Sequence, residues 1–218
     1  MQNQIVSRKD WLEARRLLLI KEKAHTRERD QLAKLRQEMP WTTIGKNYVF
    51  TGLTGEISLR DLFLDRSQLA IYHFMFGPEW ETPCAGCTSW ANAFNGTTSL
   101  FKQADARLVA VSRAPFEKLA AQREKYGWNF TWVSSFDSDF NFDFFVSSVD
   151  LSDQSTKTVD AEGGESVSFD RGENQGVSIF YKNTDDQIFH TYSTYNRGIE
   201  DLNGAFGYFD LLPKGRAW

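Results

Sequence analysis

The feature that most constrains the fold is an apolar run at residues 68–76, QLAIYHFMF. Nearly every position in the run is apolar or aromatic, which is typical of a central strand covered on both faces. A second run of this kind, RLVAVS, follows at 107–112. The pattern predicts helices at 84–103 and 115–126, the second with Pro115 in its first turn. This order of strands and helices predicts an α/β protein with a central sheet flanked by helices.

Shorter segments complete the predicted body, which covers residues 41–218. Further strands are expected at 48–50, 55–58 and 132–134, a hairpin at 176–181 and 187–192, and a last helix near 199–206. The hairpin adds antiparallel strands, so the expected sheet is mixed. Residues near 147–176 are polar and rich in glycine, and we expect an irregular insertion there.

The N-terminal segment has a different character. Residues 7–39 follow a helical pattern that opens with Ser7 and Asp10, a variant of the capping box, and Pro40 ends it. Residues 1–38 carry ten basic and six acidic side chains. We therefore expect residues 1–40 to form a helical extension that packs on the body or on a second copy of the chain, as a homodimer. An arm that binds acidic surfaces is the alternative.

Composition excludes some partners. The net charge of −4 gives no reason to expect nucleic acid or an anionic membrane, and no stretch approaches the roughly 18 apolar residues of a membrane span. The first residues, MQNQIVSRKDW, lack the pattern of a signal peptide. We therefore expect a cytoplasmic protein, in which a structural disulfide is not anticipated.

The only two cysteines, Cys84 and Cys87, stand in the motif CAGC just after the first apolar run. Thr88 follows the second cysteine, which excludes covalent haem attachment because that needs histidine there. A structural zinc ion needs about four ligands, and none of the three histidines stands at ligand spacing from the pair. No metal or bound cofactor is expected.

A redox role explains the pair better. Cys-x-x-Cys at the start of a helix that follows a buried strand places the first thiol where free backbone N–H groups favour a negative charge. The second thiol lies almost one turn further on, close enough to displace the first from a mixed disulfide. Cys84 would attack and Cys87 would resolve. The alternative is an unreactive buried pair.

A cation for the attacking thiol must come from elsewhere in the fold. Glu79 and Glu81 precede Cys84, and nearby acids raise a thiol pKa. Arg113 follows the second buried strand, and parallel strands bring their carboxyl ends to one edge of the sheet. Arg113 is therefore the candidate activating residue, with a surface arginine that caps a loop as the alternative.

Several stretches together resemble a known family. They are YHFMFGPEW with CAGC, then VSRAP, YGWNFTWVSSFDSDFNFDF, and IFHTYSTYNRG with FGYFDLLPKGR. From about residue 41 onward the chain is similar to bacterial thioredoxin-like proteins classed as a domain of unknown function. The resemblance implies a thioredoxin-like fold and an antioxidant or disulfide-exchange role.

The chain departs from thioredoxin itself. Ala85 and Gly86 separate the cysteines in place of Gly-Pro, and Trp80 lies four positions ahead of Cys84. The proline that thioredoxins place before the hairpin strand has no counterpart, since the chain reads QGVS from Gln175. That loop binds peptides in thioredoxins, so general reduction of protein disulfides is in doubt.

A similarity to peroxiredoxins is also present. Pro78, Thr82, Cys84 and Arg113 imitate the set that surrounds the peroxidatic cysteine of that family, although the spacing from threonine to cysteine is one residue short. Trp80 and Thr82 are therefore candidate substrate-binding residues. Tyr192 and Tyr195 are further candidates, because they follow the hairpin and could line a pocket near the thiols. Satisfied core or edge polar groups are the alternative for both tyrosines.

Residues 132–145 mix phenylalanine with Asp137, Asp139 and Asp143. The glycine and distal glutamate of a calcium loop are missing, so we expect the rings to fill the core and the carboxylates to cap turns. His73 lies inside the first apolar run and is expected to be a hydrogen-bonded core histidine. No nucleophile elbow supports hydrolase chemistry.

The sequence thus predicts a thiol–disulfide oxidoreductase or a thiol-dependent peroxidase. Its substrate would be a peroxide or a disulfide, and an external thiol would supply the electrons. The alternative is a non-catalytic thioredoxin-fold module that uses its aromatic residues to hold a small ligand or a protein partner.

Overall fold

The computed structural model describes residues 4–148, 156–160 and 166–216. The chain divides into two compact units, residues 1–40 and 41–218. The first unit contains the helix α1 (Arg8–Glu38). Its N-cap is Ser7, whose hydroxyl accepts a hydrogen bond from the backbone N–H of Asp10 at 3.2 Å and donates one to the Asp10 carboxylate at 2.7 Å. The expected capping pair is therefore confirmed.

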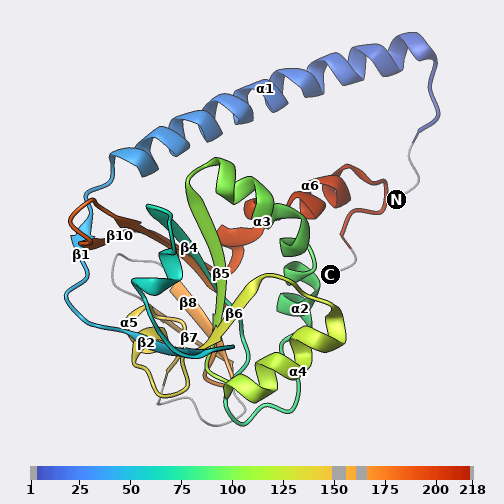
Figure 1. The fold of residues 1–218 in the computed structure, drawn as a ribbon. Coiled ribbons are helices and arrows are strands. Elements are labelled where there is room, and N and C mark those ends of the chain that lie inside the picture. Colours follow the sequence, from blue (N-terminus) through green and yellow to red (C-terminus); the bar gives the residue numbers. More distant parts are fainter. Residues whose placement is uncertain (1–3, 149–155, 161–165, 217–218) are drawn as a thin grey trace. The chain divides into compact units, whose positions relative to one another are not determined.

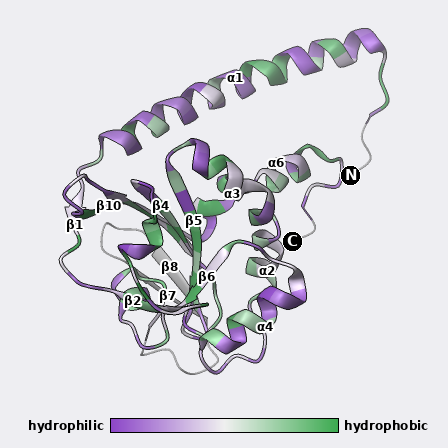
Figure 2. Ribbon diagram, viewed as in Figure 1, coloured by the Kyte–Doolittle hydropathy of each residue, from purple (hydrophilic) through white to green (hydrophobic). Residues whose placement is uncertain are grey.

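Hydrophilic and hydrophobic turns alternate along α1 (Figure 2), and none of its residues is buried. Its exposed apolar side chains include Trp11, Leu18 and Leu35. A helix of this length in which charged residues predominate is stabilised mainly by its own backbone and pairs such as Arg15–Glu22, at 2.8 Å.

The second unit is built on an eight-stranded mixed sheet (Figure 1) with the order β1-β10-β9-β4-β5-β6-β2-β3. β4, β5 and β6 are parallel at its centre, and the other pairs are antiparallel. The strands are β1 (Thr42–Thr43), β2 (Val49–Gly52), β3 (Gly55–Ser58), β4 (Gln68–His73), β5 (Ala106–Ser112), β6 (Thr131–Ser134), β9 (Gly176–Lys182) and β10 (Ile188–Tyr195).

Short helices complete this unit. They are η1 (Asp61–Phe63), α2 (Ala85–Ala91), α3 (Phe94–Gln103), α4 (Phe116–Tyr126), α5 (Phe140–Asp143), η3 (Asn196–Leu202) and α6 (Gly204–Leu211). The mixed sheet with flanking helices is the expected fold class. The expected strands all form, and their bounds differ from the predicted ones by at most three residues.

Alternation along β4 explains how one apolar run serves two cores. Ala70 and Tyr72 face a core that also contains residues of α2, α3 and α4. Leu69 and Ile71 face the opposite core, which contains Phe140 of α5. Successive side chains of a strand point to opposite faces, so a central strand must be apolar at every position.

The single helix expected at 84–103 is wrong, because α2 ends at Ala91 and α3 begins at Phe94. Asn92 and Asn95 lie at the break and bond to the segment that leads into β6. The Asn92 side-chain oxygen accepts from Trp128 Nε1 at 2.8 Å, and Asn95 bonds to Gly127 and Asn129. Asparagine side chains that find such partners compete with the helix.

The last helix is also divided, because Asn203 separates η3 from α6. Its side chain accepts a hydrogen bond from the backbone N–H of Ala205 at 3.1 Å and so caps α6.

The prediction of an irregular insertion near 147–176 is wrong for ten of its residues. They form β7 (Thr156–Asp160) and β8 (Ser166–Asp170), which pair with each other antiparallel in a separate two-stranded sheet. The β-branched residues of TKTVD and the alternation in SVSFD favour strands. Residues 149–155 and 161–165 of the insertion lie outside the described residues.

Candidate functional site

The loop that follows β4 brings Cys84 back beside the residues that directly follow this strand. Phe74, Met75 and Phe76 continue beyond β4 as buried residues. The backbone N–H of Cys84 donates to the carbonyl of Met75 at 3.1 Å, so the loop closes on itself before α2 begins. Lys118 of α4 ties this loop from outside, because its Nζ donates to the carbonyls of Pro78 and Trp80 at 2.8 and 3.1 Å.

Cys84 is the N-cap of α2 and is partly exposed. Its Sγ accepts a hydrogen bond from the backbone N–H of Cys87 at 3.5 Å. The Cys87 thiol, and then the backbone N–H groups of Cys87 and Gly86, lower the pKa of Cys84 to about 6, while burial and the Asp170 carboxylate oppose the shift. At neutral pH Cys84 is therefore mostly a thiolate, the reactive form of cysteine.

Cys87 is fully buried one turn further on. The neighbouring Cys84 sulfur and then burial raise the pKa of Cys87 well above its ordinary value. Its single thiol proton has two acceptors within reach: the Cys84 sulfur, and the side-chain oxygen of Gln175 at 3.6 Å from Cys87 Sγ. The two cysteines, both free, thus form a pair of one thiolate and one thiol.

Gln175 belongs to a polar segment, Glu173–Asn174–Gln175, that leads into β9 and was missed by sequence reasoning. The buried Glu173 carboxylate accepts hydrogen bonds from Arg113 Nη1 at 3.0 Å and from Ser147 Oγ at 2.8 Å. Burial raises the pKa of Glu173 to about 7 in spite of Arg113. The signal available in the sequence was a polar tripeptide between Gly172 and Gly176, directly before a buried strand. The described residues contain no cis peptide bond.

Arg113 does follow β5 as expected, but its partner is Glu173. Its guanidinium also lies over the Phe142 ring, 4.5 Å from the centroid. Within the described chain no hydrogen bond or ion pair joins Arg113 to Cys84. The N–H groups and thiol of the CAGC turn stabilise the Cys84 thiolate instead, since they are covalently held within reach.

The structure brings two of the four predicted substrate-binding residues to the thiols. Trp80 and Thr82 lie in the loop that precedes Cys84. Trp80 is buried, packs against Gly77, and carries the Arg171 guanidinium 3.7 Å from its ring centroid. Thr82 is exposed and lines a surface depression with Ala85 and Thr88 of the cysteine turn.

The two tyrosines lie elsewhere. Tyr195 is buried with Val146 and Phe169, and its ring covers Gly176. It therefore supports the backbone beside Gln175. Tyr192 pairs with Ile179 in the middle of β9, after a register shift between His190 and Tyr192 that interrupts the expected alternation.

The two histidines of the sheet belong to one hydrogen-bond chain, which is buried at His73 and partly buried at His190. His73 Nε2 bonds to Ser178 Oγ at 2.8 Å, Ser178 to Ser193 at 2.7 Å, and Ser193 to His190 Nε2 at 2.8 Å. Burial lowers the pKa of His73 to about 3, so it is a neutral core histidine, as expected.

The aspartates of residues 132–145 hold their loop by charge. Asp139 and Asp143 accept from Lys46 at 2.7 and 2.8 Å, and Asp143 also accepts from the Tyr48 hydroxyl. Phe140 and Phe144 fill the core beneath them. The rings thus fill the core as predicted. The prediction that the carboxylates cap turns is wrong for Asp139 and Asp143, which bind Lys46 and Tyr48, and Asp139, the N-cap of α5, makes no side-chain cap bond.

A pocket of about 220 Å³ is lined by residues of the core that also contains Cys87. Tyr72, Trp90, Phe94 and Phe101 provide its aromatic lining, and Leu202 to Gly204 form its rim. No charged side chain lines it, so it fits an apolar molecule.

Comparisons with known proteins agree with this fold. The sequence model of a bacterial family described as "Bacterial protein of unknown function (DUF899)" matches residues 1–218. Peroxiredoxin Q from Xanthomonas campestris is 20% identical, with a TM-score of 0.50 over 72% of this chain and 86% of that chain. A cysteine-to-serine mutant of PrxQ from Xylella fastidiosa is 15% identical, with a TM-score of 0.50 over 77% of this chain and 94% of that chain.

At these identities the likeness establishes the thioredoxin-like fold of peroxiredoxins. A search of curated proteins gives no match. Among the described residues, no helix has the length and apolar character needed to cross a membrane.

Proposed function

We propose that this chain, which belongs to the DUF899 family of bacterial proteins of unknown function, is a thiol-dependent oxidoreductase that reduces peroxides. One observation carries the proposal. The partly exposed Cys84 has a pKa of about 6, and a buried Cys87 thiol stands directly beside it.

In the first step the Cys84 thiolate attacks one peroxide oxygen. The O–O bond breaks, Cys84 becomes a sulfenic acid, and the other oxygen leaves as an alcohol or water after taking a proton. In the second step Cys87 attacks the Cys84 sulfur, the S–O bond breaks, and water leaves with the thiol proton. An external dithiol then reduces the Cys84–Cys87 disulfide by exchange and restores both thiols.

A small peroxide suits this site better than a protein disulfide. Gln175 occupies the place of the peptide-binding proline of thioredoxins, and its side chain is bonded to Cys87. The similar solved structures are peroxiredoxins, which supports the same choice. Disulfide exchange through the same two sulfurs is the second activity to assay. A reducing compartment such as the cytoplasm would supply the thiol reductant.

The experiment is peroxide consumption by the purified chain with a dithiol reductant. Cys84→Ser is expected to abolish turnover, and Cys87→Ser to permit one oxidation of Cys84 without disulfide formation. Ser89→Ala, on the exposed face of α2, is the matched control and should keep wild-type turnover. Peroxide consumption by Cys84→Ser at the wild-type rate would refute the proposal.

The aromatic pocket favours one alternative, a binding module for an uncharged apolar ligand. Calorimetric titration of the protein with naphthalene tests this alternative by measuring the heat of binding. Saturable binding that persists in Cys84→Ser, in a chain without peroxide turnover, would favour the module. Ala93→Phe, which fills the pocket beside α3, should then remove binding.

A further inference from the structure

Tyr72 is a buried tyrosine that the steps above do not use. It stands on β4 and is fully buried in the core beneath α2. Its ring stacks on Trp90 with centroids 4.6 Å apart and meets Phe94 edge-on at 5.2 Å. Its hydroxyl has no regular hydrogen-bond partner among the described residues. Buried hydroxyls are usually paired, so this one calls for an explanation.

Tyr72 belongs to the same core cluster as Cys87, and Cys84 packs against that cluster. Trp90, on which the Tyr72 ring stacks, lies three positions after Cys87 on the same helix. Burial and then Cys87 raise the pKa of Tyr72 well above its ordinary value, with a smaller contribution from Cys84. In return, the Tyr72 hydroxyl acts to lower the pKa of Cys87. The titratable groups that act on Tyr72 are therefore the two cysteines, and the Asp170 carboxylate acts in turn on Cys84.

We propose that the Tyr72 hydroxyl donates a hydrogen bond to the Cys87 sulfur as it ionises, and so speeds the resolving step. This inference rests on the proposed function. A hydroxyl donor favours a thiolate, whereas the oxygen of Gln175, which accepts from the Cys87 thiol, favours the thiol.

The arrangement also orders the two steps in time. While Cys84 is a thiolate, it is the largest influence that keeps Cys87 protonated. Oxidation of Cys84 to a neutral sulfenic acid removes that negative charge. Only burial and Gln175 then favour the protonated form of Cys87, and the Tyr72 hydroxyl favours its thiolate. Cys87 consequently ionises when there is an oxidised partner to attack, and its proton leaves with the departing hydroxide as water.

Tyr72→Phe keeps the ring and removes the donor. Reduced protein is mixed with hydrogen peroxide, quenched with acid, and analysed by mass spectrometry for sulfenic acid and disulfide between pH 5.5 and 9.5. Cys84 oxidation should stay within about twofold of wild type. Disulfide formation should slow about tenfold at pH 7, with its pH profile moved up by about one unit, since one pKa unit is a tenfold change in thiolate.

Tyr48→Phe is the matched control, because that hydroxyl bonds to Asp143 in the other core of the sheet. It should leave the rate and pH profile of disulfide formation unchanged. A Tyr72→Phe variant with the wild-type profile would overturn the proposal.

A second measurement needs no peroxide, so it separates this inference from the proposed function. In Cys84→Ser the pKa of Cys87 is followed by the ¹³Cβ chemical shift of the labelled cysteine. Adding Tyr72→Phe should raise that pKa by about one unit. An unchanged pKa would refute the role of Tyr72 even if the chain proves to be a peroxidase.

Discussion

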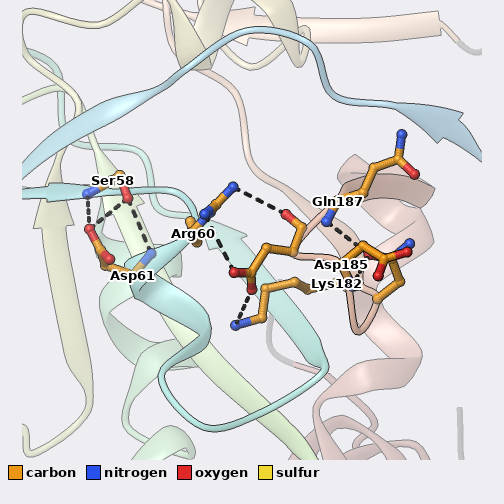
Figure 3. A network of polar contacts seen from close by, with 8 residues as sticks. Ser58, Arg60, Asp61, Lys182, Asp185 and Gln187 are labelled. Atoms are coloured by element: carbon orange, nitrogen blue, oxygen red, sulfur yellow. Dashed lines mark hydrogen bonds and ion pairs between the residues drawn. The ribbon is translucent and has the colours of Figure 1, made fainter.

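The two ends of the central strand β4 differ in how polar and charged groups are placed there. β4 begins beside the hairpin turn at residues 183–187, where Gln68 pairs with Tyr181, and it ends beside Gly176, where the cysteine loop starts. Figure 3 shows the polar network at the first end, in which Arg60 and Lys182 both meet Asp186. The side chains of Arg60 and Asp186 are more than half exposed to solvent, and that of Lys182 is partly buried.

At the beginning of β4, local polar contacts within each turn accompany the ion pairs of Asp186. Ser58 and Asp61 bond to each other through side chain and backbone, and Ser58 lowers the pKa of Asp61. The side-chain oxygen of Asn183 accepts from the backbone N–H groups of Asp185 and Gln187, which closes the turn. Such contacts fix the shape of a surface, and exposed ion pairs contribute only about 0–1 kcal/mol.

At the end of β4, polar groups are buried and incompletely balanced. Tyr72 has no regular partner, Cys87 shares one proton between two acceptors, and Glu173 is buried with a pKa raised to about 7. Burial, rather than the number of charges, therefore distinguishes the end of the sheet at which we propose the reactive cysteines.

The largest predicted effect is a difference in the free energy of unfolding between two variants, each of which lacks one acidic side chain at one end of β4. Glu173→Ala leaves the partly buried Arg113 without its partner, and we expect a loss of about 2–3 kcal/mol in the free energy of unfolding. Asp186→Ala should cost less than about 1 kcal/mol. Urea denaturation of the reduced proteins measures both. Equal losses would contradict the contrast between the two ends.

The next effect concerns Cys84 alone. Its pKa of about 6 depends first on the Cys87 thiol, so Cys87→Ser should move the pH midpoint of its alkylation by iodoacetamide upward. The limit of that movement is the ordinary thiol value of about 8.5. Ser89→Ala should leave the midpoint near 6. A midpoint that stays near 6 in Cys87→Ser would show that backbone N–H groups suffice.

A smaller effect follows from the protonation of Glu173. Its pKa is about 7 in the folded chain and 4.5 ordinarily, so the folded state retains a proton that the unfolded state has lost. The stability from this group is complete below pH 4.5 and is lost as the pH rises through 7. Glu173→Gln should lack this decline, as measured by urea denaturation across pH 4.5–7.5. The same slope in the variant would assign the decline to another group.

Deleting residues 1–40 is expected to have the smallest effect on the stability and activity of the sheet-containing unit. The core clusters of the sheet contain no residue of this unit, so residues 41–218 should keep their thermal midpoint and peroxide turnover. The exposed apolar residues of α1 support our proposal that it joins two copies of the chain. Size-exclusion chromatography should then give a dimer for the whole chain and a monomer for the deletion. An unchanged oligomeric state would refute that role.

Local patterns predicted most of the scaffold. The runs at 68–76 and 107–112 are apolar at nearly every position, and such a pattern fits only a strand with a core on each side. Ser7 and Asp10 marked the beginning of α1 because a capping pair acts within one turn. The division at Asn92 was not predictable in this way, because the bonds that compete with the helix come from residues 127–129.

The strand and helix patterns predicted an α/β fold and put the two cysteines at the start of a helix, because strand burial and the CAGC turn depend on neighbours along the chain. The thioredoxin-like form of that fold was what the family resemblance implied. Which groups act on the sulfurs depends on tertiary contacts. Strand order made Arg113 the candidate cation for Cys84, yet Glu173, sixty residues away, is its partner. Tyr72 belonged to a predicted core strand, and Gln175 stood before the hairpin strand, where the proline of thioredoxins has no counterpart. The proposed roles of Tyr72 and Gln175 depend on a buried site that distant segments of the chain form. Groups in such a site are weakly solvated, so near neighbours can change the pKa of the sulfurs.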